Sequence, residues 1–287
     1  MTSLAIKDVA ERTGIAAGTI RMWEQRYGFP VPDRTASGYR RYSDDDVEAL
    51  RRVASYRRLG LSVPAAIERV LADDTTMLDQ PSIYAAVVAV DEQARPQLLK
   101  KSTMLALSRA IEHETIASAT SPVIFATFQV EAAYRPAQPR YRRMARQAEA
   151  ATVFADFPAV WHPEGGARSG PVEIPIDLDD AIGNEWAVIV DSPGYAACLL
   201  GWEHPQGFAP MGKDDARRRF EAIWTVHPRA VRRAAEVAAR LTSQVDPDYG
   251  AHLESLLRDR PLAAETPSPA LTGLMNRAIA YLEGRAL

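Results

Sequence analysis

Three stretches near the start of the chain decide the fold of its first part: residues 6–15 (IKDVAERTGI), residues 19–28 (TIRMWEQRYG) and residues 38–42 (GYRRY). The first two read as short amphipathic helices separated by a turn. The third is basic and aromatic and predicts a hairpin. Two packed helices followed by such a hairpin are typical of a winged helix-turn-helix, a fold that places one helix in the major groove of DNA.

The spacing of apolar residues supports the two helices. Ile6 and Val9 are three residues apart, which puts them on one face of a first helix, and Ile20 and Trp23 repeat that spacing in a second. Gly14 lies between them, where glycine can adopt the left-handed conformation that ends a helix. We therefore expect Trp23 to lie in the core of a small helical domain rather than against DNA bases.

Charge distinguishes this helix pair from an ordinary packed core. Between residues 12 and 42 the chain has six basic side chains and two acidic ones, a local balance of +4 in a chain whose formal net charge is -3. The basic residues are Arg12, Arg21, Arg26, Arg34, Arg40 and Arg41, and the acidic ones are Glu24 and Asp33. A basic patch on an acidic chain is an electrostatic footprint for phosphate, and guanidinium groups suit bidentate contacts to phosphate or guanine. Double-stranded DNA is the expected partner.

Together these motifs resemble the DNA-binding domain of the MerR family of transcription regulators. The resemblance is carried by residues 20–28 and 38–42, with Pro32 and Arg34 between them. Residues 43–47 (SDDDV) add the start of another helix, with serine as its N-cap and acids in its first turn. Residues 1–73 are therefore expected to form a mainly α-helical, winged helix-turn-helix domain.

The resemblance also implies which residues contact DNA. The expected DNA-binding residues are Thr19, Arg21, Met22, Arg26, Arg34, Tyr39, Arg40, Arg41 and Tyr42. Thr19 and Arg21 resemble recognition-helix positions that meet bases and phosphates, and residues 39–42 resemble the wing that grips the flanking backbone. Arg26 and Arg34 either orient the wing or touch phosphate. The competing interpretation of each arginine is a solvated surface charge.

Composition limits the class of protein. Cys198 is the single cysteine, which excludes an intramolecular disulfide and a disulfide-stapled secreted scaffold. Charged residues interrupt the first apolar stretch, so no signal peptide is expected, and no apolar run approaches the roughly 20 residues of a membrane helix. We expect a cytoplasmic protein with no membrane partner. Its 287 residues are enough for two domains.

The rest of the chain reads as a connector, an α+β domain and a tail. Residues 74–97 are expected to form a helical connector or dimerisation region, residues 98–245 a sensory domain, and residues 246–287 a C-terminal helical tail. A long helix is expected to begin at Pro96 and to continue through Leu98 and Leu99 to about Ile116. An apolar stripe at residues 271–282 either docks on its own domain or is offered to a partner.

Within the sensory domain the hydrophobic pattern changes to that of strands. The expected strands are Val123–Phe128, Ala151–Phe157, Trp186–Val190, Ala197–Trp202 and Phe220–Val226. A basic helix is expected at residues 139–150, a turn at residues 193–194 and a final helix at residues 228–241. One sheet of about five strands with flanking helices is an α+β fold.

This second part resembles the DICT domain, a sensory domain found beside diguanylate cyclases, two-component proteins and MerR-type DNA-binding units. The resemblance covers residues 98–242 and is carried by residues 107–112, 128–129, 202–203 and 220–225, although the family more often has glycine in place of Ala222. The residues expected to line a sensor pocket are Glu112, Gln129, Trp202, Glu203 and Trp224. The alternative is that the tryptophans fill the core and the polar groups hydrogen-bond within it.

Sequence patterns of catalysis and metal binding are missing. The five histidines show neither an H-x-x-x-H nor an H-E-x-x-H spacing, and no glycine-rich phosphate loop follows a strand. Cys198 lies among apolar residues, where a free cysteine is usually a small buried hydrophobe. The Asp-x-His-x-x-Gly motif of cobalamin-binding MerR relatives is also absent. We expect no enzymatic activity, no metal and no cofactor.

The combined interpretation is a dimeric, sequence-specific transcription regulator. The MerR resemblance implies a homodimer on a pseudo-palindromic promoter site, where its effector-loaded form twists a long spacer so that RNA polymerase reads both promoter elements. An unknown small-molecule or protein signal would act through the DICT-like domain. One alternative is a repressor or architectural DNA-binding protein whose second domain mediates oligomerisation or protein–protein contact. Another is a protein-interaction module with a degenerate DNA-binding unit.

Overall fold

The computed structural model describes residues 4–35, 38–58, 63–71, 82–88, 96–178, 180–203 and 218–264, together with Met275 and Ile279. The chain divides into two compact units, Met1–Leu78 and Asp79–Leu287. Each unit has its own buried apolar core. The break predicted near residue 74 lies outside the described residues.

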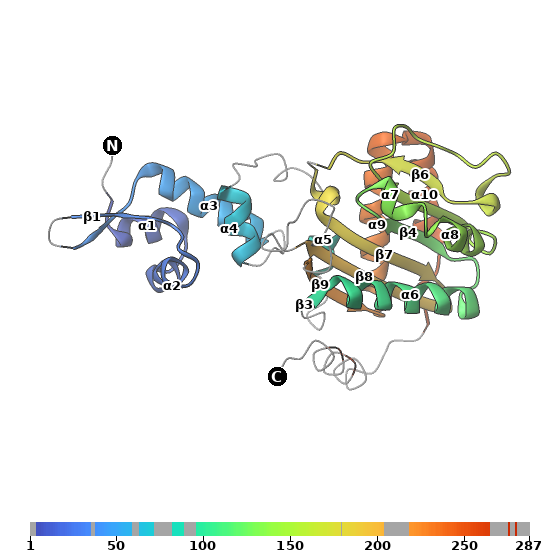
Figure 1. Cartoon of the computed structure of the whole chain (residues 1–287), viewed down its shortest axis with the longest axis horizontal. Helices are drawn as coiled ribbons and strands as arrows, with labels where there is room; N and C mark the ends of the chain where they lie inside the picture. The colour runs from blue at the N-terminus through green and yellow to red at the C-terminus, as the bar shows by residue number, and fades with distance from the viewer. Residues whose placement is uncertain are drawn as a thin grey trace. The chain divides into compact units, whose positions relative to one another are not determined.

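The N-terminal unit is a helical domain with a two-stranded hairpin (Figure 1). Its elements are α1 (Ile6–Thr13), α2 (Ala17–Tyr27), β1 (Asp33–Arg34), β2 (Arg40–Arg41), α3 (Asp44–Arg58) and α4 (Val63–Leu71). Gly14 ends α1 in the left-handed conformation with a φ of 71°, as predicted. Ser43 caps α3 in a reciprocal pair with Asp46, whose backbone N donates to Ser43 Oγ at 3.0 Å and whose carboxylate accepts from Ser43 N at 2.8 Å.

The second unit is built on one mixed sheet of seven strands in the order β3-β9-β8-β7-β4-β5-β6. The strands are β3 (Gln97–Lys100), β4 (Val123–Thr127), β5 (Ala150–Ala155), β6 (Val172–Pro175), β7 (Glu185–Ser192), β8 (Tyr195–Glu203) and β9 (Arg219–Thr225). Neighbours pair in parallel between β4, β5 and β6 and antiparallel elsewhere. All five predicted strands are present, so the α+β class is confirmed.

Helices cover both faces of this sheet (Figure 1). They are α5 (Ile83–Val88), α6 (Lys101–Ser118), α7 (Glu131–Tyr134), α8 (Gln138–Ala145), α9 (Pro228–Val245) and α10 (Pro247–Asp259), with short 3₁₀ turns η2 (Ala167–Ser169) and η3 (Ala181–Asn184). One face packs against α6, α7 and α8 through residues such as Ile124 and Leu199. The other face packs against α9, which in turn contacts α5 and α10.

Two strands at the edges of the sheet depart from the prediction. The helix predicted from Pro96 is wrong in its first turn, because residues 97–100 pair with β9 and bury Leu99 at the sheet edge before α6 begins. The four-residue strand β6 is missed because it is short, with a proline directly before it and another as its last residue. Glu173 is only 4% exposed and is neutralised by Arg135, whose Nη1 lies 2.6 Å from Glu173 Oε1. Proline within or beside a short run argues against a strand in sequence-based prediction.

The regions expected as connector and tail both contribute to the second unit. Helix α5, from the expected connector, packs against α9, β7 and β8. Ile279, from the expected tail, is 4% exposed and packs with Leu99 and Phe220. Met275 is 41% exposed, and the remaining residues of the predicted stripe, Leu271, Leu274, Ala278 and Leu282, lie outside the described residues.

A buried ion pair joins the sheet to α9 and α10. Arg232 Nη2 donates to Asp191 Oδ1 at 3.2 Å, and Arg232 Nε donates to the other oxygen at 2.5 Å. The same guanidinium donates to the carbonyls of Leu257, Arg260 and Pro261 at 2.8, 3.0 and 3.3 Å. Arg232 therefore satisfies carbonyls at and just beyond the C-terminal end of α10, as well as the carboxylate of Asp191, a residue that is 2% exposed.

We predict that Arg232→Met lowers the free energy of unfolding by about 3–5 kcal/mol, because it leaves the carboxylate of Asp191 buried and uncompensated. The double variant Asp191→Leu/Arg232→Met should recover part of this loss. The loss of stability that remains comes from the carbonyls of Leu257, Arg260 and Pro261, which no longer have a donor. Urea unfolding of the three proteins measures both quantities. A loss below about 1 kcal/mol in the single variant would show that Asp191 does not depend on Arg232.

Candidate functional site

Helix α2 presents one exposed face. Gly18, Arg21, Met22 and Gln25 follow the i, i+3, i+4, i+7 spacing of a single helical face, and all four are exposed. A Cβ built on Gly18 would meet no atom within 4 Å, so this position leaves the backbone of α2 open to close approach. The opposite face packs Ile20 into the core. Gln25 is not among the predicted DNA-binding residues, although its three-residue spacing from Met22 places it on the same face.

The predicted wing is present as the hairpin of β1 and β2. Asp33 pairs with Arg41 and Arg34 with Arg40. Thr35 closes the described part of the turn, accepting from Tyr39 N at its side chain at 3.0 Å and donating its own N–H to the carbonyl of Tyr39 at 2.9 Å. Tyr39 is 71% exposed. The hairpin therefore holds an aromatic ring out into solvent beside the basic strand β2.

One acidic side chain ties this wing to α2. Glu24 is 15% exposed and accepts from Arg40 Nε at 2.6 Å and from Arg34 Nη2 at 3.4 Å. The hydrogen bond to Glu24 raises the pKa of Arg40 further above its ordinary value. Both arginines are thus held between the hairpin and the helix, so Glu24 fixes the angle between the two elements expected to meet DNA.

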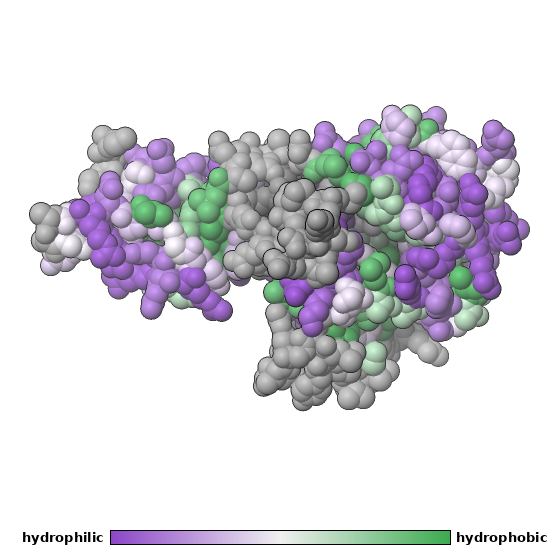
Figure 2. Space-filling model, viewed as in Figure 1, coloured by the Kyte–Doolittle hydropathy of each residue, from purple (hydrophilic) through white to green (hydrophobic). Residues whose placement is uncertain are grey.

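The other predicted DNA-binding residues differ in exposure. Arg21, Arg26 and Arg41 are exposed and form no ion pair with any described residue. Thr19 is half-buried near the start of α2. Tyr42 is 1% exposed and pairs through its backbone with Leu4, which places its side chain in the core. Figure 2 shows hydrophilic residues over most of the visible face of this unit.

In the second unit the structure does not bring the five predicted pocket residues together. The strand register pairs Trp202 with Glu221 and Trp224 with Leu199, and these pairs point to opposite faces of the sheet because Leu199 and Trp202 are three residues apart. Trp224 packs on the α6 face, whereas Trp202 is 3% exposed on the other. A single cavity lined by both tryptophans is therefore ruled out, which corrects the prediction.

The three polar members of the predicted pocket form internal ion pairs and hydrogen bonds. Arg218 Nε donates to Glu203 Oε1 at 2.6 Å, and Gln129 Nε2 donates to Glu203 Oε2 at 3.1 Å. Gln129 Oε1 accepts from Arg218 in turn. Glu112 lies elsewhere, on α6, where it pairs with Arg140 of α8. The Glu203 group closes the ends of β8 and β9, and Glu112 joins α6 to α8.

The described residues offer neither a helical membrane span nor a metal-binding cluster. No described helix is long and apolar enough to cross a membrane. Where side chains are described, none of them gather into a group of three or more histidine, cysteine, aspartate or glutamate residues that would hold a metal ion.

Two family models match the chain. Residues 4–73 match the MerR helix-turn-helix family of regulatory proteins. Residues 80–204 match DICT, a sensory domain of diguanylate cyclases and two-component systems. The second match begins before α5, so this helix belongs to the sensory domain by sequence as well as by packing.

Similar proteins are transcription regulators. The repressor CarA of Myxococcus xanthus is 50% identical over 70 residues, 24% of this chain and 24% of that protein. The repressor CarH of the same organism is 28% identical over 122 residues, 42% of this chain and 40% of that protein. The regulator CueR of Vibrio cholerae is 30% identical over 113 residues, 39% of this chain and 78% of that protein. The chain belongs to the MerR family.

MerR-family proteins are DNA-binding transcription regulators rather than enzymes, and in this chain a DICT sensory domain follows the DNA-binding unit. The chain spans about a quarter of CarA and two-fifths of CarH.

A buried carboxylate caps the first helix of the DICT domain. Glu185 is 1% exposed and accepts from Ser82 Oγ at 2.5 Å, from Ile83 N at 3.2 Å and from Tyr84 N at 3.4 Å. Burial raises the pKa of Glu185 to about 7, although these hydrogen bonds oppose the shift. Tyr84 adds a second tie, donating from its hydroxyl to Glu221 at 3.0 Å. Helix α5 is thus fastened to β7 and β9 by two carboxylates.

We predict that the stability of the DICT domain falls as pH rises from about 4.5 to about 7. The pKa of Glu185 is higher in the folded than in the unfolded state, so the folded state binds the extra proton in this window. The change is of the order of 1–3 kcal/mol. Chemical unfolding of wild-type protein and Glu185→Gln across this range tests it, because the variant should lack that part of the pH dependence.

The matched control is Glu236→Gln, which removes a half-exposed carboxylate paired with Arg233 on α9. Its pH profile should follow that of the wild type. If Glu185→Gln also followed the wild type, the titrating group in this window would not be Glu185.

Proposed function

We propose that this MerR-family regulator acts as a homodimer that binds a pseudo-palindromic promoter site and changes its effect on transcription when its DICT domain receives a signal. The observation that carries the DNA-binding part is the exposed face of α2 beside the wing. Three arginines there, Arg21, Arg26 and Arg41, pair with no acid among the described residues. Unpaired guanidinium groups are available to phosphates and base edges.

Within this proposal the two elements have different tasks. The face of Arg21, Met22 and Gln25 enters the major groove, where arginine reads guanine and glutamine reads adenine. Thr19 and the open backbone at Gly18 lie near the N-terminus of α2, which favours a phosphate. Tyr39 and Arg41 grip the flanking backbone, and Arg34 and Arg40 position the wing through Glu24. Tyr42 takes a structural role.

The partners follow from the family. A two-fold symmetric dimer matches a pseudo-palindromic site, and indirect readout of a deformable spacer adds specificity at bases that the protein never touches. RNA polymerase at the same promoter is the second proposed partner. The proposed location is the cytoplasm, where that DNA lies. CarA and CarH are named as repressors, so repression is the sign of regulation that these two relatives favour. The signal is a small molecule or a protein acting on the DICT domain.

The experiment that tests the proposal is selection of fragmented genomic DNA by the purified full chain at physiological salt. Enrichment of a pseudo-palindrome that lies between promoter elements supports a dimeric promoter-binding regulator. Sedimentation of the protein with that fragment gives the stoichiometry. Absence of enrichment, or one protomer per site, would contradict the proposal.

We predict that Arg41→Ala weakens binding about equally on all sequences and lowers the slope of log K against log salt by about 0.9, the value for one lost phosphate contact. Arg21→Ala should instead cost roughly 1–3 kcal/mol on the selected site and little on unrelated DNA. Fluorescence anisotropy at several salt concentrations separates the two effects. Arg233→Ala, on α9, is the control and should match the wild type. The assignment of Arg41 fails if its salt slope is unchanged.

We predict that Glu24→Gln lowers affinity for the selected site several-fold, because Arg40 and Arg34 lose the carboxylate that positions the wing. Charge alone argues for the reverse, since removal of an acid strengthens attraction to DNA. The free energy of unfolding should change by less than about 1 kcal/mol, because the pair is partly exposed to solvent. Glu48→Gln, which breaks the exposed pair with Arg51 on α3, is the matched control. Tighter binding by Glu24→Gln would contradict the positioning role.

A further inference from the structure

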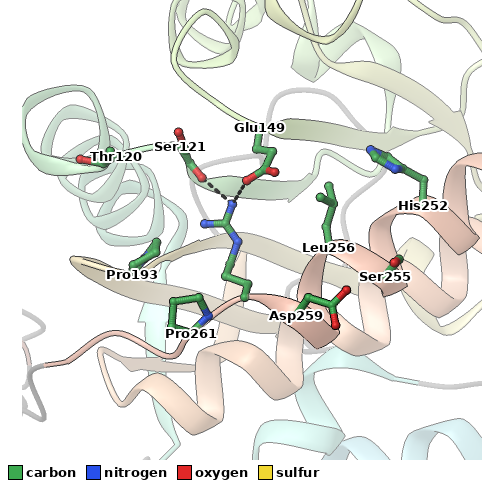
Figure 3. Close-up of a pocket in the computed structure, with 10 residues that line it drawn as sticks. Thr120, Ser121, Glu149, Pro193, His252, Ser255, Leu256, Asp259 and Pro261 are labelled. Atoms are coloured by element: carbon green, nitrogen blue, oxygen red, sulfur yellow. Dashed lines mark hydrogen bonds and ion pairs between the residues drawn. The ribbon is translucent and has the colours of Figure 1, made fainter.

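A pocket of about 550 Å³ lies in the DICT domain, within the size range of small-molecule sites. It is formed by the connection between α6 and β4, the residue before β5, the turn between β7 and β8, and the C-terminal half of α10 (Figure 3). None of the residues expected to sense a signal lines it. Its polar residues include Ser121, Glu149, His252 and Asp259, with Arg260 among the lining side chains.

Arg260 is the most deeply placed charge in this pocket. Its side chain is 5% exposed, and a single nitrogen, Nη2, makes both of its bonds, to the carbonyl of Ser121 at 2.6 Å and to the carboxylate of Glu149. Figure 3 marks these two bonds on Ser121 and Glu149. Among the described residues, Nε and Nη1 of Arg260 have no partner. Arginine N–H donors at such a site are suited to a carboxylate.

A hydrogen bond from Arg232 fixes the backbone at Arg260. Its carbonyl accepts from Arg232 Nη1 at 3.0 Å, and Arg232 is itself fixed by the buried carboxylate of Asp191. On the opposite wall Ser121 has a φ of 47°, a left-handed conformation unusual for a residue other than glycine. Backbone strain of this kind persists where the surrounding structure enforces it and is common at ligand sites.

The charges around Arg260 define the ligand. Two carboxylates, Glu149 and Asp259, line the same pocket as one guanidinium, so a simple anion would meet repulsion and a simple cation would meet Arg260. A molecule with both charges matches both groups. We propose that this pocket binds a free α-amino acid, whose carboxylate accepts from Arg260 and whose ammonium lies against Glu149 and Asp259. Binding of the amino acid does not depend on the proposed function. Regulation of DNA binding by that amino acid rests on the proposed sensing function.

The test is thermal unfolding of the full chain with each of the twenty standard α-amino acids, each beside its deaminated acid and its decarboxylated amine. At about ten times its Kd, the matching amino acid should raise Tm by roughly 3–5 °C, and the acid and amine by much less. The proposal is overturned if no amino acid raises Tm, or if the acid or the amine is as effective as the amino acid.

Two variants locate the site. Arg260→Gln should abolish the rise in Tm. Arg258→Gln, two residues earlier in the last turn of α10 and outside this pocket, should keep it. Glu149→Gln retains the guanidinium but loses the ammonium partner, so its preference should move from the amino acid towards the deaminated acid. This variant keeps the test valid if Arg260→Gln fails to fold. Unchanged preference in Glu149→Gln, or an undiminished shift in folded Arg260→Gln, would place the binding elsewhere.

Anisotropy on the selected DNA, with and without the amino acid, distinguishes this inference from the proposed function. A Tm shift with no change in DNA binding supports the pocket and contradicts sensing through it. DNA binding with no Tm shift overturns the pocket and leaves the DNA-binding proposal intact.

Discussion

The pairing of Arg232 with Asp191 is the interaction on which the DICT domain depends. Asp191 lies in β7, at the middle of the sheet, and Arg232 reaches it from α9 while donating to carbonyls at the end of α10. A charge buried in this way costs desolvation energy that only its partners offset. One guanidinium therefore sets the positions of a strand and two helices, and it places Arg260 at the pocket wall.

The DNA-binding unit also has an ion pair that joins two elements, but it contributes less to stability. Glu24 joins α2 to the wing through Arg40 and Arg34, but these side chains are partly exposed, so the pair contributes little to the free energy of unfolding. Its contribution is to geometry, because it holds the hairpin against the helix. In the proposed complex, where both elements meet one DNA duplex, Glu24 serves recognition without touching DNA.

Local signals in the sequence predicted much of this fold, and long-range pairing accounts for what they missed. The end of α1 at Gly14 and the start of α3 at Ser43 are set by residues close in sequence, so both boundaries could be predicted. The face on which Trp202 or Trp224 lies depends on register between β8 and β9, which alternation within one strand does not reveal. The edge strand β3 and the carboxylate of Glu173 inside β6 likewise acquire meaning only from partners distant in the chain.

Strand β7 offers a physical route between the pocket and the start of the DICT domain. It begins at Glu185, which caps α5, and ends at Ser192, whose hydroxyl donates to the carbonyl of the pocket residue Thr120 at 2.8 Å. Helix α5 is the first described element after the division between the units. Position along a route is not coupling, which requires two arrangements that a ligand binds unequally. The hydrogen bonds that Glu185 accepts from Ser82, Ile83 and Tyr84 are the contact through which a movement of β7 would reach α5.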